Sequence, residues 1–130
     1  MMDLGTVAPT DTKTAERLEI IGGKRLYGSV KTSGAKNAVL KLMAASLLTN
    51  NRCIIRNVPH IKDVEIMIGV LRALGADVNW EDNTTLLINS NHGLGYSAPD
   101  ELVREMRASV QVMGPLLTRT GRVKLFQPGG

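Results

Sequence analysis

The residues best suited to chemistry form the short run Ser33-Gly34-Ala35-Lys36-Asn37. It separates a stretch that predicts a strand from an apolar pattern at 3–4 spacing that predicts a helix. A glycine there lets a ligand approach the backbone, and the first N–H groups of the helix would meet that ligand with a positive dipole end. The Lys36 ammonium adds a mobile charge, and the Asn37 amide adds a donor and an acceptor. The run predicts a cradle for phosphate or carboxylate, although a plain turn with a solvated lysine has the same spacing.

A second candidate is Arg107, which lies in the middle of a predicted helix. The small side chains of Ala108 and Ser109 follow it and would let a ligand reach the guanidinium. The alternative is an arginine that extends from the rim of an apolar stripe into water. The remaining basic residues near the end of the chain, Arg119, Arg122 and Lys124, fit simple surface charge.

Cysteine and histidine give no catalytic or metal-binding pattern. Cys53 begins an apolar stretch and is expected to be a buried, inert thiol. His60 and His92 have no carboxylate, serine or cysteine partner at a recognisable spacing, so we expect solvated or capping roles. Asp63 and Glu65 are expected to be helix-start acids that favour the dipole. No metal site and no cofactor site are predicted.

Strands and helices in an α/β order must position these residues. The order β-β-α-β-α-β-β-α-β indicates a layered α/β fold. The third helix should be kinked by Pro115 and should bury the stripe Val103, Met106, Val110, Met113 and Leu117. The predicted strands are residues 18–21, 25–32, 53–58, 76–80, 84–89 and 122–127, and the predicted helices are residues 36–49, 62–74 and about 100–119.

Composition narrows the class of protein. The chain has 130 residues, of which 43% are hydrophobic, so it can bury a core. Aromatic residues make up only 3%, which argues against stacking on single-stranded nucleic acid. No apolar run approaches the roughly 18 residues of a membrane span, and the single cysteine excludes an internal disulfide framework. We therefore expect a cytoplasmic protein that binds neither nucleic acid nor membrane.

The net charge of +4 is unevenly distributed. Residues 24–62 contain eight basic side chains and no acid, whereas residues 63–105 contain eight acids against two arginines. Residues 106–130 are again free of acids. Such segregation predicts an anion site or a paired surface, with ordinary solvated faces as the alternative.

The two ends of the chain have their own patterns. Residues 1–17 lack apolar periodicity and predict a flexible leader. The chain stops at Pro128-Gly129-Gly130, a turn that a following segment would use. We therefore expect a fragment.

Several motifs together resemble the family of UDP-N-acetylglucosamine enolpyruvyl transferases. The resemblance covers about residues 18–130, and the related transferase that acts on shikimate phosphate has a different sequence around its lysine. The matching motifs are Gly28-x-Val30-x-x-Ser33-Gly34-Ala35-Lys36-Asn37-Ala38, Arg56-Asn57-Val58-Pro59 with Asp63-Val64, Leu74-Gly75-Ala76, Met106-Arg107-Ala108-Ser109, Gly114-Pro115-Leu116 and Pro128-Gly129-Gly130.

The resemblance implies a reaction and its binding residues. The enolpyruvyl group of phosphoenolpyruvate would move to the 3′-hydroxyl of UDP-N-acetylglucosamine with release of phosphate, the first committed step of peptidoglycan synthesis. No metal or organic cofactor would take part. The family pattern implies that Lys36 and Asn37 hold phosphoenolpyruvate and that Arg107 contacts the substrates. The alternatives are the related shikimate-phosphate transferase and a non-catalytic anion-binding domain.

The resemblance also implies a fold, an inside-out α/β barrel of two lobes made of repeated strand–helix units. Residues 18–34 would be strands of the second lobe, and residues 35–130 would be the incomplete opening part of the catalytic lobe. The family's general-acid cysteine, the target of fosfomycin, would follow Gly130, and Cys53 does not match it. We therefore expect no catalytic residue here and no turnover without the rest of the chain.

Overall fold

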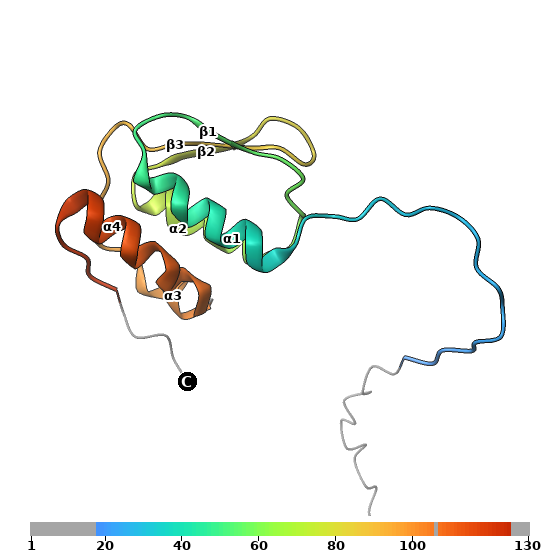
Figure 1. Ribbon diagram of the computed structural model, residues 1–130. Coiled ribbons are helices and arrows are strands. Elements are labelled where there is room, and N and C mark those ends of the chain that lie inside the picture. Colours follow the sequence, from blue (N-terminus) through green and yellow to red (C-terminus); the bar gives the residue numbers. More distant parts are fainter. Residues whose placement is uncertain (1–17, 106, 126–130) are drawn as a thin grey trace, which may run out of the picture. The chain divides into compact units, whose positions relative to one another are not determined.

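The computed structural model describes residues 18–105 and 107–125 (Figure 1). Side chains are described for these residues except 100, 103, 105 and 107–109. The described residues fall into two units, 18–30 and 31–125. Among the helices described, none is long and apolar enough to cross a membrane.

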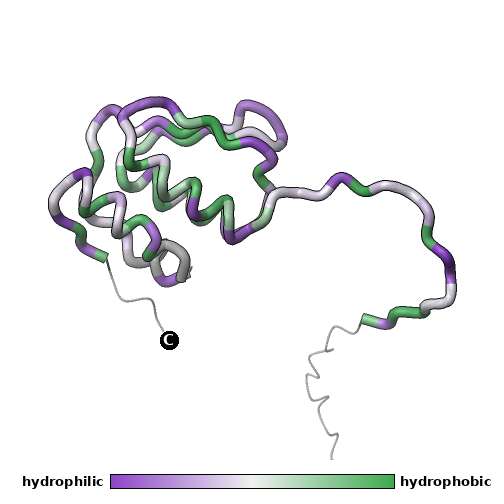
Figure 2. Tube along the Cα trace, viewed as in Figure 1, coloured by the Kyte–Doolittle hydropathy of each residue, from purple (hydrophilic) through white to green (hydrophobic). Residues whose placement is uncertain are grey.

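The described part of the first unit is an extended segment. Residues 18–35 form neither helix nor strand, so the strands expected at 18–21 and 25–32 are absent. A strand needs a neighbour to receive its hydrogen bonds, and residues 18–30 contain none. Figure 2 shows hydrophobic stretches along this segment. Six large apolar side chains in it are 81–92% exposed: Leu18, Ile20, Ile21, Leu26, Tyr27 and Val30.

The second unit contains a three-stranded antiparallel sheet. Its strands are β1 (Cys53–Ile55), β2 (Asp77–Trp80) and β3 (Leu86–Asn89), in the order β1-β3-β2. The predicted hairpin is confirmed, and it pairs Val78 with Ile88. β1 is shorter than the strand predicted at 53–58, because Asn57 turns the chain with a φ of 59°. Of the strand predicted at 122–127, the described residues 122–125 form one isolated bridge, between Ser97 and Lys124, and residues 126 and 127 lie outside the described part.

Two of the three predicted helices are confirmed. α1 (Lys36–Ala45) continues into the 3₁₀ turn η1 (Ser46–Leu48), and α2 (Lys62–Ala73) ends at Leu74. Gly75 then adopts a φ of 97°, and the next residue, Ala76, donates its N–H to the carbonyl of Leu71 at 3.0 Å. This left-handed turn is the helix stop that the glycine predicted.

The third helix is divided differently from the expectation. α3 (Asp100–Glu105) is followed by the 3₁₀ helix η2 (Arg107–Val112) and then by α4 (Met113–Thr120). Pro115 does not make the break, because it is the third residue of α4, where a proline needs no N–H partner.

The buried face also differs where side chains are described, whereas those of Val103 and Met106 lie outside the described part. Val112 and Leu116 are fully buried, whereas Met113 is 42% exposed and Leu117 is 52% exposed. The tighter 3₁₀ turns rotate the chain before α4 begins, so a 3.6-residue period does not predict the face.

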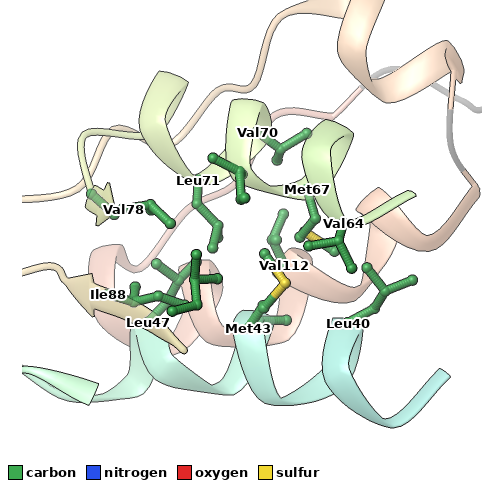
Figure 3. Packing of buried hydrophobic residues seen from close by; sticks show 14 of the residues in the cluster. Leu40, Met43, Leu47, Val64, Met67, Val70, Leu71, Val78, Ile88 and Val112 are labelled. Atoms are coloured by element: carbon green, nitrogen blue, oxygen red, sulfur yellow. The ribbon is translucent and has the colours of Figure 1, made fainter. Parts of the chain in front are cut away.

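One hydrophobic core lies between the sheet and the helices. α1 and α2 lie side by side against the sheet (Figure 1). η2 contacts α1, and α4 contacts η1. Figure 3 shows Val112 among the side chains of Met43 from α1 and Met67 from α2. Both methionines are fully buried, as their spacing predicted. Because the core packs α1 against α2, it holds the first turns of the two helices in place relative to one another.

Candidate functional site

Lys36 and Asn37 are the first two residues of α1. Ala35 precedes them in an extended conformation and provides no side-chain cap. The carbonyl of Ala35 receives the N–H groups of Ala38 and Val39 at 3.1 and 3.0 Å. The earlier N–H groups of a helix have no acceptor inside it. This end of α1 therefore presents free donors beside two exposed polar side chains, as the predicted cradle requires.

Gly34 packs against the protein's own backbone, which occupies the space that a ligand would need. Its N–H donates to the carbonyl of Asn57 at 3.1 Å. A β-carbon on residue 34 would overlap that carbonyl oxygen and would also lie 3.6 Å from the Cδ of Pro59. The expectation that this glycine opens the backbone to a ligand is wrong, because the loop after β1 occupies the space. The close contact instead fixes the direction in which the chain enters α1.

A carboxylate lies against the candidate lysine. The Nζ of Lys36 is 2.6 Å from the Oδ2 of Asp63, the second residue of α2. The sequence predicted Asp63 only as a helix-start acid. In the sequence, the one sign of an ion pair here is that the basic block ends and the acidic block begins at residue 63. The ion pair joins the two blocks and the starts of two neighbouring helices.

The structure places Arg107 only by its backbone. It is the first residue of η2, an element that contacts α1. Its side chain lies outside the described residues, so its predicted contact with substrate stays a prediction. Lys36 and Asn37 lie together on α1. Arg107 belongs to η2, which packs against α1.

A hollow of about 540 Å³ adjoins the segment that leads into α1. It is lined by residues 31–33, by Arg56 and Asn57 from the loop after β1, and by Thr84 and Thr85 before β3. The lining contains two cations, Lys31 and Arg56, and no carboxylate. These charges add to the positive character of the chain around Gly34.

The histidines have partners that the sequence did not predict. The ring of His60 stacks on Trp80 with centroids 4.1 Å apart, and its Nε2 donates to the carbonyl of Asn83 at 2.7 Å. Its Nδ1 is 3.8 Å from a carboxylate oxygen of Glu65. The Nε2 of His92 is 3.7 Å from Asp77. Both side chains stay more than half exposed, as expected for solvated histidines, and turns bring them to carboxylates that have no simple spacing in the sequence.

Arg119 is also more than surface charge. Its guanidinium donates to the carbonyls of Leu47 and Thr49 at 2.7 and 3.0 Å, and to the Oδ1 of Asn50. It further donates to the carbonyl of Ser90 at 3.3 Å. These contacts hold α4 to the end of η1 and to the turn after β3, so the role of Arg119 is structural.

Cys53 is half-buried in β1, and its thiol faces the carbonyl of Asn51 at 3.9 Å. It lies apart from the α1 terminus in sequence and has no histidine partner among the described side chains. Within residues 18–105 and 107–125, no three His, Cys, Asp or Glu side chains gather as metal ligands would. The site at the start of α1 consists of Lys36 paired with Asp63, the amide of Asn37 and backbone donors, of which the ammonium, the amide and the backbone donors suit an anion.

The chain is similar to several enzymes of known name. The UDP-N-acetylglucosamine 1-carboxyvinyltransferase of Dichelobacter nodosus is 46% identical over 115 residues, which are 88% of this chain and 27% of that protein. The enzyme of the same name from Thermotoga maritima is 46% identical over 114 residues, again 88% and 27%. That from Rickettsia canadensis is 48% identical over 118 residues, 88% and 28%. The chain thus spans about a quarter of the length of these relatives.

A solved structure agrees with the fold. The enolpyruvyl transferase NikO from Streptomyces tendae matches with a TM-score of 0.67 and 28% identity, over 77% of this chain and 23% of that chain. The mixture of helices with a small sheet is that of a piece of this α/β fold, as the sequence predicted. Residues 20–130 match the EPSP synthase (3-phosphoshikimate 1-carboxyvinyltransferase) family. The chain therefore belongs to the EPSP synthase family of enolpyruvyl transferases.

Proposed function

We propose that this chain supplies the phosphoenolpyruvate-binding part of a UDP-N-acetylglucosamine enolpyruvyl transferase. The observation that carries the proposal is the placement of Lys36 and Asn37 on the uncapped first turn of α1. The names of relatives at 46–48% identity support UDP-N-acetylglucosamine as the acceptor substrate. In the cell this reaction opens peptidoglycan synthesis, so we propose a cytoplasmic enzyme that supports growth and division and that fosfomycin inhibits.

The chemistry moves one group and releases another. The 3′-oxygen of the sugar bonds to C2 of phosphoenolpyruvate while a proton adds to C3, which gives a tetrahedral intermediate. A proton then leaves C3 and the double bond re-forms as the bond from C2 to the phosphate oxygen breaks and releases inorganic phosphate. The proton of the sugar hydroxyl leaves as the new bond forms. The ammonium of Lys36, the amide of Asn37 and the free N–H groups of α1 would hold the anionic groups of phosphoenolpyruvate. Arg107 would contact the bound substrates.

The extended first segment fits the same proposal. Residues 18–34 would become strands when they pair with a second lobe, which would bury the six apolar side chains that are exposed here. Residues 35–130 would form the opening part of the catalytic lobe. The relatives are about four times as long as the matched segment, so they have enough chain to form both lobes.

A chimera tests the proposal. Residues 18–130 would replace the matching segment of the Dichelobacter nodosus relative, and phosphate release would be measured with each acceptor. We expect release that depends on UDP-N-acetylglucosamine and that falls by at least about a hundredfold in Lys36→Ala. Lys41→Ala, an exposed lysine on the same helix, should keep full activity. Unchanged activity of Lys36→Ala would refute the role of the lysine.

The shikimate-phosphate transferase is the second candidate, because the matched family is described as 3-phosphoshikimate 1-carboxyvinyltransferase. The same assay separates the two. Phosphate release that requires shikimate 3-phosphate would favour the second candidate. A chimera inactive with both acceptors that binds a generic DNA duplex in a salt-sensitive way would favour a non-catalytic anion-binding domain.

A further inference from the structure

The candidate lysine is held by an acid from the next helix. Lys36 Nζ and Asp63 Oδ2 are 2.6 Å apart, and the two side chains are 54% and 32% exposed. Lys36 is the first residue of α1, and Asp63 is the second residue of α2. The pair thus joins the starts of two helices whose packing places them next to one another.

The two partners differ in how firmly they are held. Asp63 has a short side chain, and its charge is stabilised at the positive end of α2, where Glu65 is the other acid of the first turn. Lys36 has a flexible four-carbon stem and no acid in its own first turn. The fixed carboxylate therefore orders the mobile ammonium.

The ammonium retains donors for a second partner. An ammonium group has three N–H donors, and a single contact at 2.6 Å to Asp63 occupies one of them. More than half of the lysine side chain faces solvent. Lys36 can therefore hold an anion while it stays bound to Asp63, so substrate binding does not require the ion pair to break.

We propose that Asp63 is a positioning residue of the transferase, which holds the Lys36 ammonium in the place where it receives phosphoenolpyruvate. The inference rests on the proposed function and adds to it a residue from another helix. Asp63 itself is an anion and would repel the substrate if it acted alone. Its net effect is favourable because an oriented ammonium contributes more than a mobile one.

The alternative hypothesis predicts the opposite change in the affinity for phosphoenolpyruvate. If Asp63 only competed with the substrate for Lys36, its removal would free the ammonium and leave Glu65 as the only acid in the first turn of either helix. Phosphoenolpyruvate would then bind more tightly. If Asp63 positions Lys36, its removal weakens binding of phosphoenolpyruvate although it makes the site more positive.

The main test uses Asp63→Asn in the chimeric enzyme, because asparagine keeps the shape and removes the charge. We expect KM for phosphoenolpyruvate to rise about tenfold or more, with KM for UDP-N-acetylglucosamine unchanged. Asp63→Glu, which keeps the charge, should recover part of the loss. A KM for phosphoenolpyruvate that falls or stays the same in Asp63→Asn overturns the proposal, as does an equal rise in both KM values.

A second measurement needs no activity. In the 130-residue chain, ¹³C relaxation of the lysine Cε groups would compare Lys36 with Lys41, which lies on the same helix with no ion pair among the described side chains. We expect Lys36 to be the more ordered of the two, and Asp63→Asn to make them equal. Equal order in the unaltered chain overturns the proposal.

The two proposals fail in different ways. If Lys36→Ala leaves activity unchanged, the proposed function of this site is wrong. If Lys36→Ala abolishes activity and Asp63→Asn does not raise KM for phosphoenolpyruvate, only the positioning role is wrong. The thermal midpoint of Asp63→Asn should fall only slightly, since the pair is partly exposed and the variant loses one charge at the start of α2. A large fall with a general loss of kcat would assign Asp63 a merely structural role and would also overturn the proposal.

Discussion

The backbone N–H of Gly34 donates to the carbonyl of Asn57 at 3.1 Å, and the same carbonyl fills the space that a β-carbon on residue 34 would need. Asn57 in turn adopts a positive φ of 59°, a conformation that asparagine tolerates better than most residues. This contact links the entry into α1 with the loop between β1 and α2. It therefore helps to place Lys36 beside Asp63.

Gly34→Ala should destabilise the second unit, because the added methyl group meets backbone and not a movable side-chain tip. The expected loss is about 1–3 kcal/mol in the free energy of unfolding, measured by urea denaturation. Gly114→Ala is the matched control, since nothing lies within 4 Å of its β-carbon position. In an α-helix this control should be neutral or stabilising. Equal stability of the two variants would contradict the steric argument.

Leu116→Ala and Leu117→Ala test which face of α4 is buried. Leu116 is fully buried, so its truncation should lower the free energy of unfolding by about 2–5 kcal/mol. Leu117 is 52% exposed, and its truncation should change that free energy by no more than about 0.5 kcal/mol. The same urea titrations measure both. If Leu117→Ala lowered the free energy of unfolding more than Leu116→Ala, the buried face would be the one that the simple helical period predicts.

Arg119→Met keeps most of the side-chain length but removes every hydrogen-bond donor. It should lower the free energy of unfolding of the second unit by about 1–3 kcal/mol. The carbonyls of Leu47 and Thr49 would lose bonds of 2.7 and 3.0 Å to the guanidinium. Lys41→Met is the control, because that lysine is exposed on α1. Thermal and urea unfolding of both variants check the prediction. If the control loses as much stability, the hydrogen bonds of Arg119 are not the cause.

Asp82 gives a prediction for acid pH. The backbone N–H of Thr84 donates to its carboxylate at 2.6 Å, and with a further N–H from Thr85 at 2.7 Å it holds the pKa of Asp82 below the ordinary 3.8. Because the folded pKa is lower than the unfolded one, the stabilisation is complete above pH 3.8 and is lost as the pH falls through the folded value. A ¹³C-carboxyl titration should show this low pKa.

Asp82→Asn is the control for that titration. Its amide oxygen can still accept the two N–H groups but does not ionise in this range. The variant should therefore lose the part of the acid-dependent destabilisation that arises below pH 3.8. An ordinary pKa for Asp82, or an unchanged pH dependence in the variant, would contradict the assignment.

The sequence by itself determined the local elements and the candidate lysine. The spacing of apolar residues in 36–49 and 62–74 placed α1 and α2, and Gly75 marked the end of α2. Such features depend on near neighbours along the chain, so a single sequence reveals them. The same holds for Lys36 and Asn37, whose position at the start of a helix was predicted from the Ser33-Gly34 break before the apolar pattern.

Only the tertiary structure decided which residues meet across those elements. The pairing of Lys36 with Asp63, the hydrogen bonds of Arg119 and the stacking of His60 on Trp80 depend on how helices and turns pack. The buried face of α4 was set by a 3₁₀ segment that no apolar period indicates. The strands expected before residue 33 did not form, because a strand requires a partner that its own sequence does not contain.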